Sequence, residues 1–185
     1  MSKSLLIKNM VCNRCITALL DLLTNQGLEV ESIQLGKIVI DDRSIFDYKK
    51  LEKQLNGLGF ELIQDSKVAL VEEIKTILIQ KLENKETDTI LQKLGTHFGK
   101  SYSVLSKTFS KSEGITLEKY LINLKIEKVK EYIQLNEFNF SEIAYSLNYK
   151  NSSHLAKQFK QVTGVSMSKY KNLYYHERIG LDKIV

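Results

Sequence analysis

Long apolar runs, proline and tryptophan are all missing from this 185-residue chain, and cysteine occurs only twice. A helix needs about 18 consecutive apolar residues to cross a membrane, and no run comes close to that length. The N-terminal stretch MSKSLLIKNM also lacks the apolar core and the small-residue cleavage site of a signal peptide. We therefore expect a cytoplasmic protein with no membrane partner.

The residue combinations that catalysis needs are also missing. The histidines, His97, His154 and His176, lie far along the chain from the only cysteines, Cys12 and Cys15. No histidine, carboxylate and nucleophile occur together at a spacing that favours catalysis, and no glycine-rich loop is present to bind phosphate. We therefore predict that the protein is not an enzyme.

The composition is typical of a soluble globular protein, with 43% apolar and 26% charged residues, so the chain should fold. Its net charge of +5 is unevenly distributed. Residues 1–65 carry 8 Lys and Arg against 9 Asp and Glu, whereas residues 66–185 carry 19 against 13. Positive charge concentrated in one part of the chain favours a polyanionic partner. A lysine-rich solvated surface would give the same count.

Residues 1–65 alternate between strand and helix patterns. Apolar runs and helical spacings predict, in chain order, elements at residues 4–11, 16–23, 30–35, 37–41, 46–58 and 60–64. Their order, strand, helix, strand, strand, helix, strand, predicts a ferredoxin-like βαββαβ sandwich, in which two helices cover one face of an antiparallel sheet.

From residue 66 onward the pattern is helical throughout. Val71, Ile74, Leu78 and Leu82 share one stripe and predict a helix over residues 68–82. Thr87 or Asp88 is the expected N-cap of the next helix. The predicted fold class is therefore α+β, with a sandwich domain at residues 1–65 and an all-α domain at residues 66–185.

An internal repeat organises the helical domain. Residues 99–120 align without a gap with residues 149–170, and from position 100 onward eight of twenty-one pairs are identical. A short helical pattern and a polar turn precede each copy, at residues 91–98 and 141–147. This order is that of the helix-turn-helix, a unit that reads duplex DNA. The repeat thus predicts two helix-turn-helix units joined by a long helix over residues 117–134.

The second helix of each copy has an apolar and a polar face. Leu105 and Phe109, like Leu155 and Phe159, are four residues apart and must be buried. The opposite face and the helix start carry short hydrogen-bonding groups and one lysine, which suit a major groove about 12 Å wide. The candidate DNA-binding residues are Tyr102, Ser103, Ser106, Lys107, Asn151, Ser152, Ser153, His154 and Lys157.

We call the second helix of each copy its reading helix. The length of the joining helix sets the spacing of the two reading helices. At 1.5 Å per residue it extends roughly 27 Å, which could place them about one duplex turn, near 34 Å, apart. Neither reading helix contains arginine, so phosphate contacts and DNA shape should contribute more than usual. Alternatively, both copies are packing units of a protein-interaction domain whose lysines are merely solvated.

The stretch SEIAYSLNYKNSSHLAKQFKQVTGVSMSKYK at residues 141–171 resembles the second helix-turn-helix of the AraC/XylS family of transcription regulators. Residues 68–134 are similar to the first half of that domain. The resemblance implies a sequence-specific regulator with double-stranded DNA as its partner, and by their position in the motif the groove-facing residues above would make the contacts. The family usually has a proline shortly after the second glycine, but Gly164 is followed here by Val-Ser-Met, which should loosen the turn.

The two cysteines stand in the stretch NMVCNRC at residues 9–15. Across a loop and helix start, Cys-x-x-Cys lets two sulfurs converge, and the helix N-terminus favours the thiolate. In a reducing cytosol a structural disulfide is not expected. Thiolates select soft or borderline ions such as Cu(I) and Zn(II). Because Zn(II) needs four ligands, Cu(I), or an ion shared by the two chains of a homodimer, fits the pair better.

Residues 4–64 resemble the heavy-metal-associated domains of soft-metal chaperones and pumps, in the Met-x-Cys-x-x-Cys loop, the element order and Gly59-Phe60. The resemblance implies that Cys12 and Cys15 are metal ligands. The loop departs from that family, because Asn9 and Val11 stand where glycine and threonine are usual. Two other interpretations remain: a sandwich used for protein contact or a small effector, with incidental cysteines, and a redox switch.

Together these patterns favour a cytoplasmic transcription regulator, with a sensor or dimerisation module before a pair of helix-turn-helix units. The alternative is a metal chaperone or interaction protein whose basic helical domain docks a protein partner.

Overall fold

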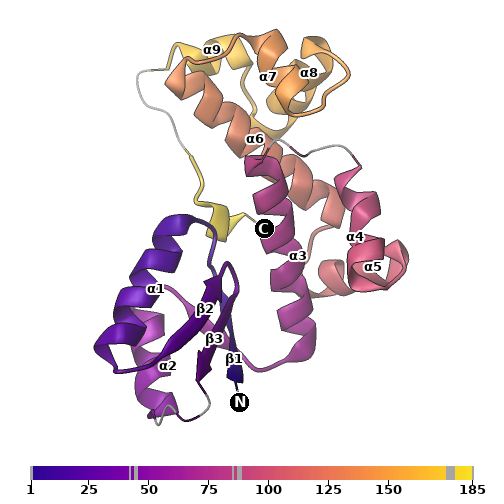
Figure 1. Ribbon diagram of the computed structural model, residues 1–185. Helices are drawn as coiled ribbons and strands as arrows, with labels where there is room; N and C mark the ends of the chain where they lie inside the picture. Colours follow the sequence, from indigo (N-terminus) through magenta and orange to yellow (C-terminus); the bar gives the residue numbers. More distant parts are fainter. Residues whose placement is uncertain are drawn as a thin grey trace. The chain divides into compact units, whose positions relative to one another are not determined.

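The computed structural model describes residues 2–41, 43, 46–84, 86, 89–173 and 178–184 (Figure 1). The chain divides into two compact units, Met1–Ile77 and Leu78–Val185. The division falls inside helix α3 (Ser66–Glu83), which contributes residues to both units. The domain boundary predicted after residue 65 lies at the start of α3 and stays a prediction.

A four-stranded antiparallel sheet forms the base of the first unit. Its strands, in the spatial order β2-β3-β1-β4, are β1 (Ser2–Lys8), β2 (Val30–Gln34), β3 (Lys37–Asp41) and β4 (Glu61–Ile63). In the centre, Leu5 of β1 lies opposite Ile38 of β3, and Ile7 lies opposite Leu62 of β4. Because side chains alternate along a strand, these four apolar residues share one face of the sheet.

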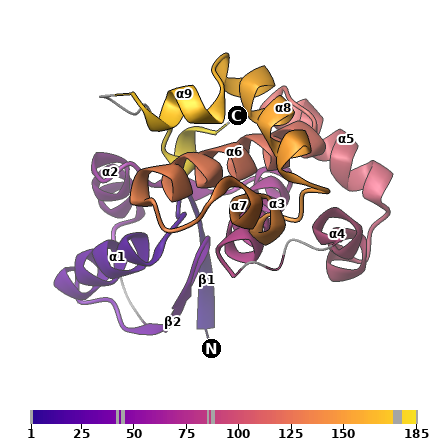
Figure 2. The same ribbon diagram turned by 90° about the horizontal axis from the view of Figure 1, so that it is seen from above.

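Helices α1 (Asn13–Asn25) and α2 (Tyr48–Gly57) cover that face together (Figures 1 and 2). Their inward side chains join the strand residues in one apolar core and are at most 2% exposed: Leu19, Leu23, Leu51 and Leu55. Full burial of each is worth about 1.5–3 kcal/mol. The observed order, strand, helix, strand, strand, helix, strand, is the one that the sequence predicts.

Among the described residues of the second unit, helices are the only regular secondary structure, and besides the end of α3 there are seven more. They are α4 (Ile90–Phe98), α5 (Tyr102–Glu113), α6 (Leu117–Leu135), α7 (Phe140–Ser146), α8 (Ser152–Thr163), α9 (Met167–Lys171) and a short 3-10 helix at Leu181–Lys183. Figure 1 shows α6 running between the α4–α5 pair and the α7–α8 pair. Helix α4 begins after Thr89; Thr87 and Asp88, the predicted N-caps, lie outside the described residues.

The sequence repeat is also a repeat of structure, because α5 and α8 begin and end at positions fifty residues apart. Ser101 caps α5 and Asn151 caps α8, each by accepting the N–H group three residues on. Gly114 and Gly164 end the two helices in the left-handed region, with φ of 74° and 78°, a conformation that glycine adopts without a steric cost.

One aromatic pair closes the core of each copy. The rings of Phe109 in α5 and Tyr120 in α6 lie 5.2 Å apart between centroids, and those of Phe159 in α8 and Tyr170 in α9 lie 5.5 Å apart. All four side chains are at most 3% exposed. These pairs fix how α5 is rotated against α6 and how α8 is rotated against α9.

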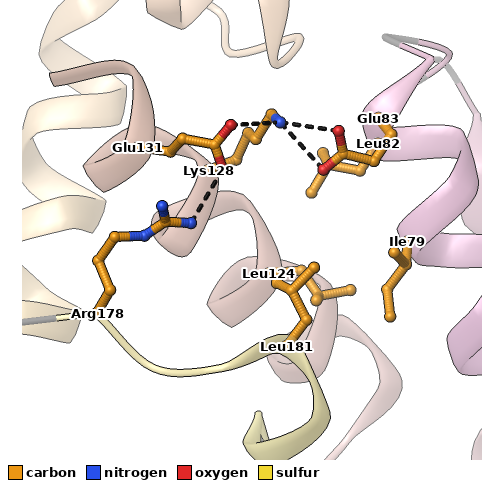
Figure 3. Close-up of a pocket in the computed structure, with 8 residues that line it drawn as sticks. All are labelled: Ile79, Leu82, Glu83, Leu124, Lys128, Glu131, Arg178 and Leu181. Carbon is orange, nitrogen blue, oxygen red and sulfur yellow. Dashed lines mark hydrogen bonds and ion pairs between the residues drawn. The ribbon is translucent and has the colours of Figure 1, made fainter. Parts of the chain in front are cut away.

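An ion network centred on the buried Lys128 holds α6 to its neighbours (Figure 3). Nζ of Lys128 lies 2.9 and 3.0 Å from the two carboxylate oxygens of Glu83 and 2.9 Å from Oε1 of Glu131. Nη2 of Arg178 binds Oε2 of Glu131 at 2.9 Å. Burial opposes the charge on Lys128, but hydrogen bonds to Glu131 and Glu83 raise its pKa. The network thus ties α3, α6 and the segment after α9 together.

No helix among the described residues combines the length and the apolar character that a membrane crossing requires.

Replacing Lys128 with methionine tests the ion network. The variant keeps an apolar side chain but lacks the ammonium group that Glu83 and Glu131 share. We therefore expect the free energy of unfolding at neutral pH to fall by about 1–3 kcal/mol. Burial opposes ionisation of Glu131, but Lys128 and Arg178 lower its pKa below the usual 4.5. The stability that this carboxylate contributes is therefore present at neutral pH and lost as the pH falls through the lowered pKa.

Urea unfolding followed by circular dichroism measures the effect. The difference between wild type and Lys128→Met should shrink as the pH falls below the ordinary glutamate value. Lys119→Met, at an exposed lysine of the same helix, is the control and should change stability by less than about 0.5 kcal/mol. Equal losses in both variants would contradict a special role for Lys128.

Candidate nucleic-acid interface

The spacing of the apolar residues in α5 predicts a polar face on the opposite side of the helix, and most of that face is exposed. Leu105 and Phe109 are completely buried, whereas Ser103 and Lys107 on the opposite side are exposed. Ser106, at the edge of this face, is half-buried. Ser103 and Lys107 are therefore the predicted contact residues that this helix presents most openly.

Tyr102, the first residue of α5, is held by the neighbouring helix. Its hydroxyl group donates a hydrogen bond to the carboxylate of Glu118 in the first turn of α6. Burial and this hydrogen bond raise the pKa of Tyr102 to about 12, so the phenol keeps its proton at neutral pH. Tyr102 can therefore keep its hydrogen bond to Glu118 at neutral pH and hold the start of α5 against α6.

Helix α8 presents the matching face of the second copy. Leu155 and Phe159 are completely buried, and Ser153, His154 and Lys157 are exposed. The other two predicted residues stand at the start of the helix. Ser152 is half-buried, and Asn151 uses its side-chain oxygen to cap the helix, accepting the N–H of His154 at 2.8 Å.

Tyr149, in the turn before α8, supports His154. The two rings meet edge to face with centroids 5.5 Å apart, and Oη of Tyr149 donates to Oε1 of Gln158 at 2.5 Å. Nζ of Lys125 lies 5.3 Å from the centre of the Tyr149 ring and donates to the Leu147 carbonyl at 2.9 Å. Burial raises the pKa of Tyr149. The imidazole of His154 is therefore backed by a fixed, neutral phenol, a contact that sequence analysis missed.

Both turns between the paired helices pass through a left-handed residue, Gly99 in the first copy of the repeat and Asn148 in the second copy, with φ of 59° and 53°. In the first copy, a side chain at Gly95 would place its Cβ 3.1 Å from the carbonyl oxygen of Lys100. Glycine at this position thus lets α4 approach the start of α5 closely. In the second copy Ala144, another small residue, is buried on α7.

The charge of both reading helices is almost purely positive. Helix α8 contains no acidic residue, and Glu113, at the very end of α5, is the only one in that helix. Exposed lysines lie on or beside the two helices: Lys100, Lys107, Lys111, Lys150, Lys157 and Lys160. With so few carboxylates nearby, the field at these faces attracts an anionic partner.

Val104 is a contact candidate that sequence analysis did not select. It lies beside Lys107 on the exposed part of the α5 surface, three residues before it, and it is 51% exposed. The repeat offers a signal that could have identified it, because the position fifty residues on is His154, which was selected.

The two cysteines meet at the start of α1, in the first unit. Their Sγ atoms are 3.6 Å apart; Cys12 is exposed at the N-cap position and Cys15 is half-buried. Burial opposes the ionisation of both thiols. For Cys12, hydrogen bonding from Cys15 and Arg14 in the first helical turn outweighs burial and lowers the pKa, whereas the pKa of Cys15 stays raised. One sulfur therefore ionises more readily than the other.

The surroundings of the cysteine pair suit an ion of low coordination number. Met10 is 2% exposed, and its sulfur accepts the N–H of Gly36 at 3.3 Å, so it belongs to the core. Within the part of the chain that the structure describes, His, Cys, Asp and Glu form no group of three that could hold a metal. Two thiols fit a two-coordinate soft ion and fall short of the four ligands of zinc.

Comparison with known proteins identifies a domain in the second half of the chain. Residues 94–172 match the family model described as a helix-turn-helix domain. The chain is 25% identical over 170 residues to the uncharacterized HTH-type transcriptional regulator YtdP of Bacillus subtilis, covering 85% of this chain and 21% of YtdP. It is 29% identical over 101 residues to the uncharacterized HTH-type transcriptional regulator YdiP of Escherichia coli, covering 55% of this chain and 33% of YdiP.

Among solved structures, the C-terminal domain of AraT, a response regulator from Geobacillus stearothermophilus, aligns with 60% of this chain and 93% of that chain, at 22% identity and a TM-score of 0.49. The chain spans only about a fifth to a third of the length of YtdP and YdiP. On the strength of the family match, residues 94–172 of this chain form a helix-turn-helix domain.

Proposed function

We propose that the chain is a cytoplasmic, sequence-specific DNA-binding transcription regulator of the AraC type, with no catalytic step of its own. The observation that carries the proposal is the structural repeat. The same polar residues, Ser103 and Lys107 in α5 and Ser153 and Lys157 in α8, are exposed on two equivalent helices. The helix-turn-helix match and the relatives named as transcriptional regulators support the same function.

The exposed groups have the chemistry that duplex recognition needs. Serine hydroxyls and the imidazole of His154 can donate and accept hydrogen bonds at base edges, and the lysines can bind phosphate or guanine. Helix α6, with 19 residues, is roughly 28 Å long. We infer that it spaces α5 and α8 so that they enter successive major grooves of one duplex.

Tyr102 and Asn151 take a different role in this proposal. Because the Tyr102 hydroxyl binds Glu118 and the Asn151 oxygen caps α8, both side chains use polar atoms within the protein. They orient the reading helices, and Ser103, Lys107, Ser153, His154 and Lys157 make the direct contacts.

Removing the two matched lysines tests the DNA assignment. In Lys107→Ala, Lys157→Ala we expect weaker binding to duplex DNA and a shallower dependence of log affinity on log salt, by about 0.9 for each lost phosphate contact. Fluorescence anisotropy with a labelled duplex, selected by the chain from a random-sequence pool, measures the slope.

The matched control removes two exposed lysines from α2 in the other unit, as Lys50→Ala, Lys53→Ala. It changes the net charge equally and should leave the slope unchanged. The assignment fails if both double variants lower the slope alike, or if the chain selects no duplex. Failure to select DNA would favour a metal chaperone or interaction protein whose basic helical half docks another protein.

We further propose that the first unit is a ferredoxin-like module of the heavy-metal-associated type whose Cys12 and Cys15 hold a soft metal ion, Cu(I) in preference to Zn(II). The sulfur separation of 3.6 Å and the lowered pKa of Cys12 support this role. Bound there, such an ion would supply a charge change that a regulator can sense. If two chains share one ion, the module also dimerises. Helix α3 is the covalent connection to the DNA-binding unit.

Metal titration of the reduced chain tests the second proposal. We expect the wild type to remove one Cu(I) ion per chain from a Cu(I) chelator. The double variant Cys12→Ser, Cys15→Ser should leave the ion with the chelator. Met10→Leu is the control, because Met10 is a core residue and its replacement should leave affinity nearly unchanged. Equal, poor binding by wild type and the serine variant would eliminate metal sensing and leave the DNA assignment intact.

A further inference from the structure

We propose that Val104 gives the first reading helix a preference for thymine, by packing its side-chain methyl groups against the C5-methyl group in the major groove. The inference rests on the proposed function, because it assigns a base preference to one position of the DNA-binding face. It concerns a residue whose side chain makes no polar contact.

The position of Val104 is that of a contact residue. It stands in the first turn of α5, about 100° around the helix from the buried Leu105, with 51% of its surface exposed. The other exposed residues of the helix around it, Ser103, Lys107 and Lys111, are polar. Val104 is therefore the one apolar group on a face otherwise built for hydrogen bonds and phosphate.

The fold itself does not require valine at this position. Only its backbone takes part in internal hydrogen bonds: its N–H donates to Oγ of Ser101 at 3.4 Å, and its carbonyl accepts the Thr108 hydroxyl at 2.9 Å. The equivalent residue of the second copy is the exposed His154, so the same architecture accepts a polar side chain there. A β-branched residue is also a weaker helix former than most polar alternatives.

Thymine is the base that an exposed valine recognises best. Its C5-methyl is the only methyl group on the major-groove edge of the four standard bases, and apolar side chains contact it. Valine has essentially one preferred χ1 rotamer in a helix, so little side-chain freedom is lost on contact. Against guanine, the same side chain would cover the N7 and O6 acceptors without satisfying them, which disfavours that base.

The two halves of the binding site should therefore differ. Helix α5 presents a methyl-reading valine where α8 presents an imidazole that donates or accepts hydrogen bonds, while Ser103 and Ser153, and Lys107 and Lys157, are the same. The difference between Val104 and His154 contributes to distinct sequences in the two half-sites and to a single orientation of the bound chain on the DNA.

The experiment replaces thymine with deoxyuridine, which lacks only the methyl group, one position at a time in a duplex selected by the full reduced chain from a random-sequence pool. At one thymine of the α5 half-site we expect affinity to fall about three- to five-fold, the effect of one lost methyl contact. Val104→Ala should bind the thymine and deoxyuridine duplexes equally well. His154→Ala is the matched control and should keep the full deoxyuridine penalty at that position.

The outcomes separate this inference from the proposal beneath it. Three results would overturn the role of Val104 alone. They are a selected duplex without a fixed thymine in this half-site, a loss of affinity below about 1.5-fold at every substituted thymine, or a loss that persists in Val104→Ala. If the pool yields no selected duplex, DNA recognition fails and this inference fails with it. Circular dichroism of Val104→Ala should match the wild type, since alanine favours the helix.

Discussion

Two aromatic contacts decide which side of each reading helix can meet a partner. Each reading helix packs its buried side through one aromatic pair, Phe109 with Tyr120 in the first copy and Phe159 with Tyr170 in the second. All four rings are buried. Because a helix has a fixed period, burying one face determines which residues face outward. Rotation of either helix would turn its serine and lysine into the core, where unpaired polar groups are costly. The proposed DNA-binding face therefore depends on the packing beneath it.

Spacing within one helix was enough to predict that face. Leu105 and Phe109, four residues apart, identify the buried side, so the exposure of Ser103 and Lys107 follows from the helical period alone. The strand and helix order of the first unit likewise follows from local apolar patterns. Contacts between distant segments could not be predicted this way. Tyr102 bound to Glu118 and Lys128 bound to Glu83 depend on how helices pack, which no local pattern specifies.

Val104 and the turn after Gly164 show where local rules mislead. An apolar residue is expected inside, so the exposure of Val104 contradicts its hydropathy, although its equivalence to His154 in the repeat indicates an exposed position. The absent proline suggests a loose turn, yet the Thr163 hydroxyl donates to the Phe159 carbonyl at 2.8 Å and accepts the Val165 N–H at 3.3 Å, and Ser166 caps α9. Side-chain hydrogen bonds therefore hold the turn that proline would otherwise restrict.

In the proposed mode of binding, α5 and α8 enter successive major grooves of a single duplex. Hydroxyl-radical footprinting of the full chain on a selected duplex measures this most directly. We expect two protected windows on one face of the DNA, with their centres about 10–10.5 base pairs apart. One continuous window, or two windows on opposite faces of the duplex, would contradict it.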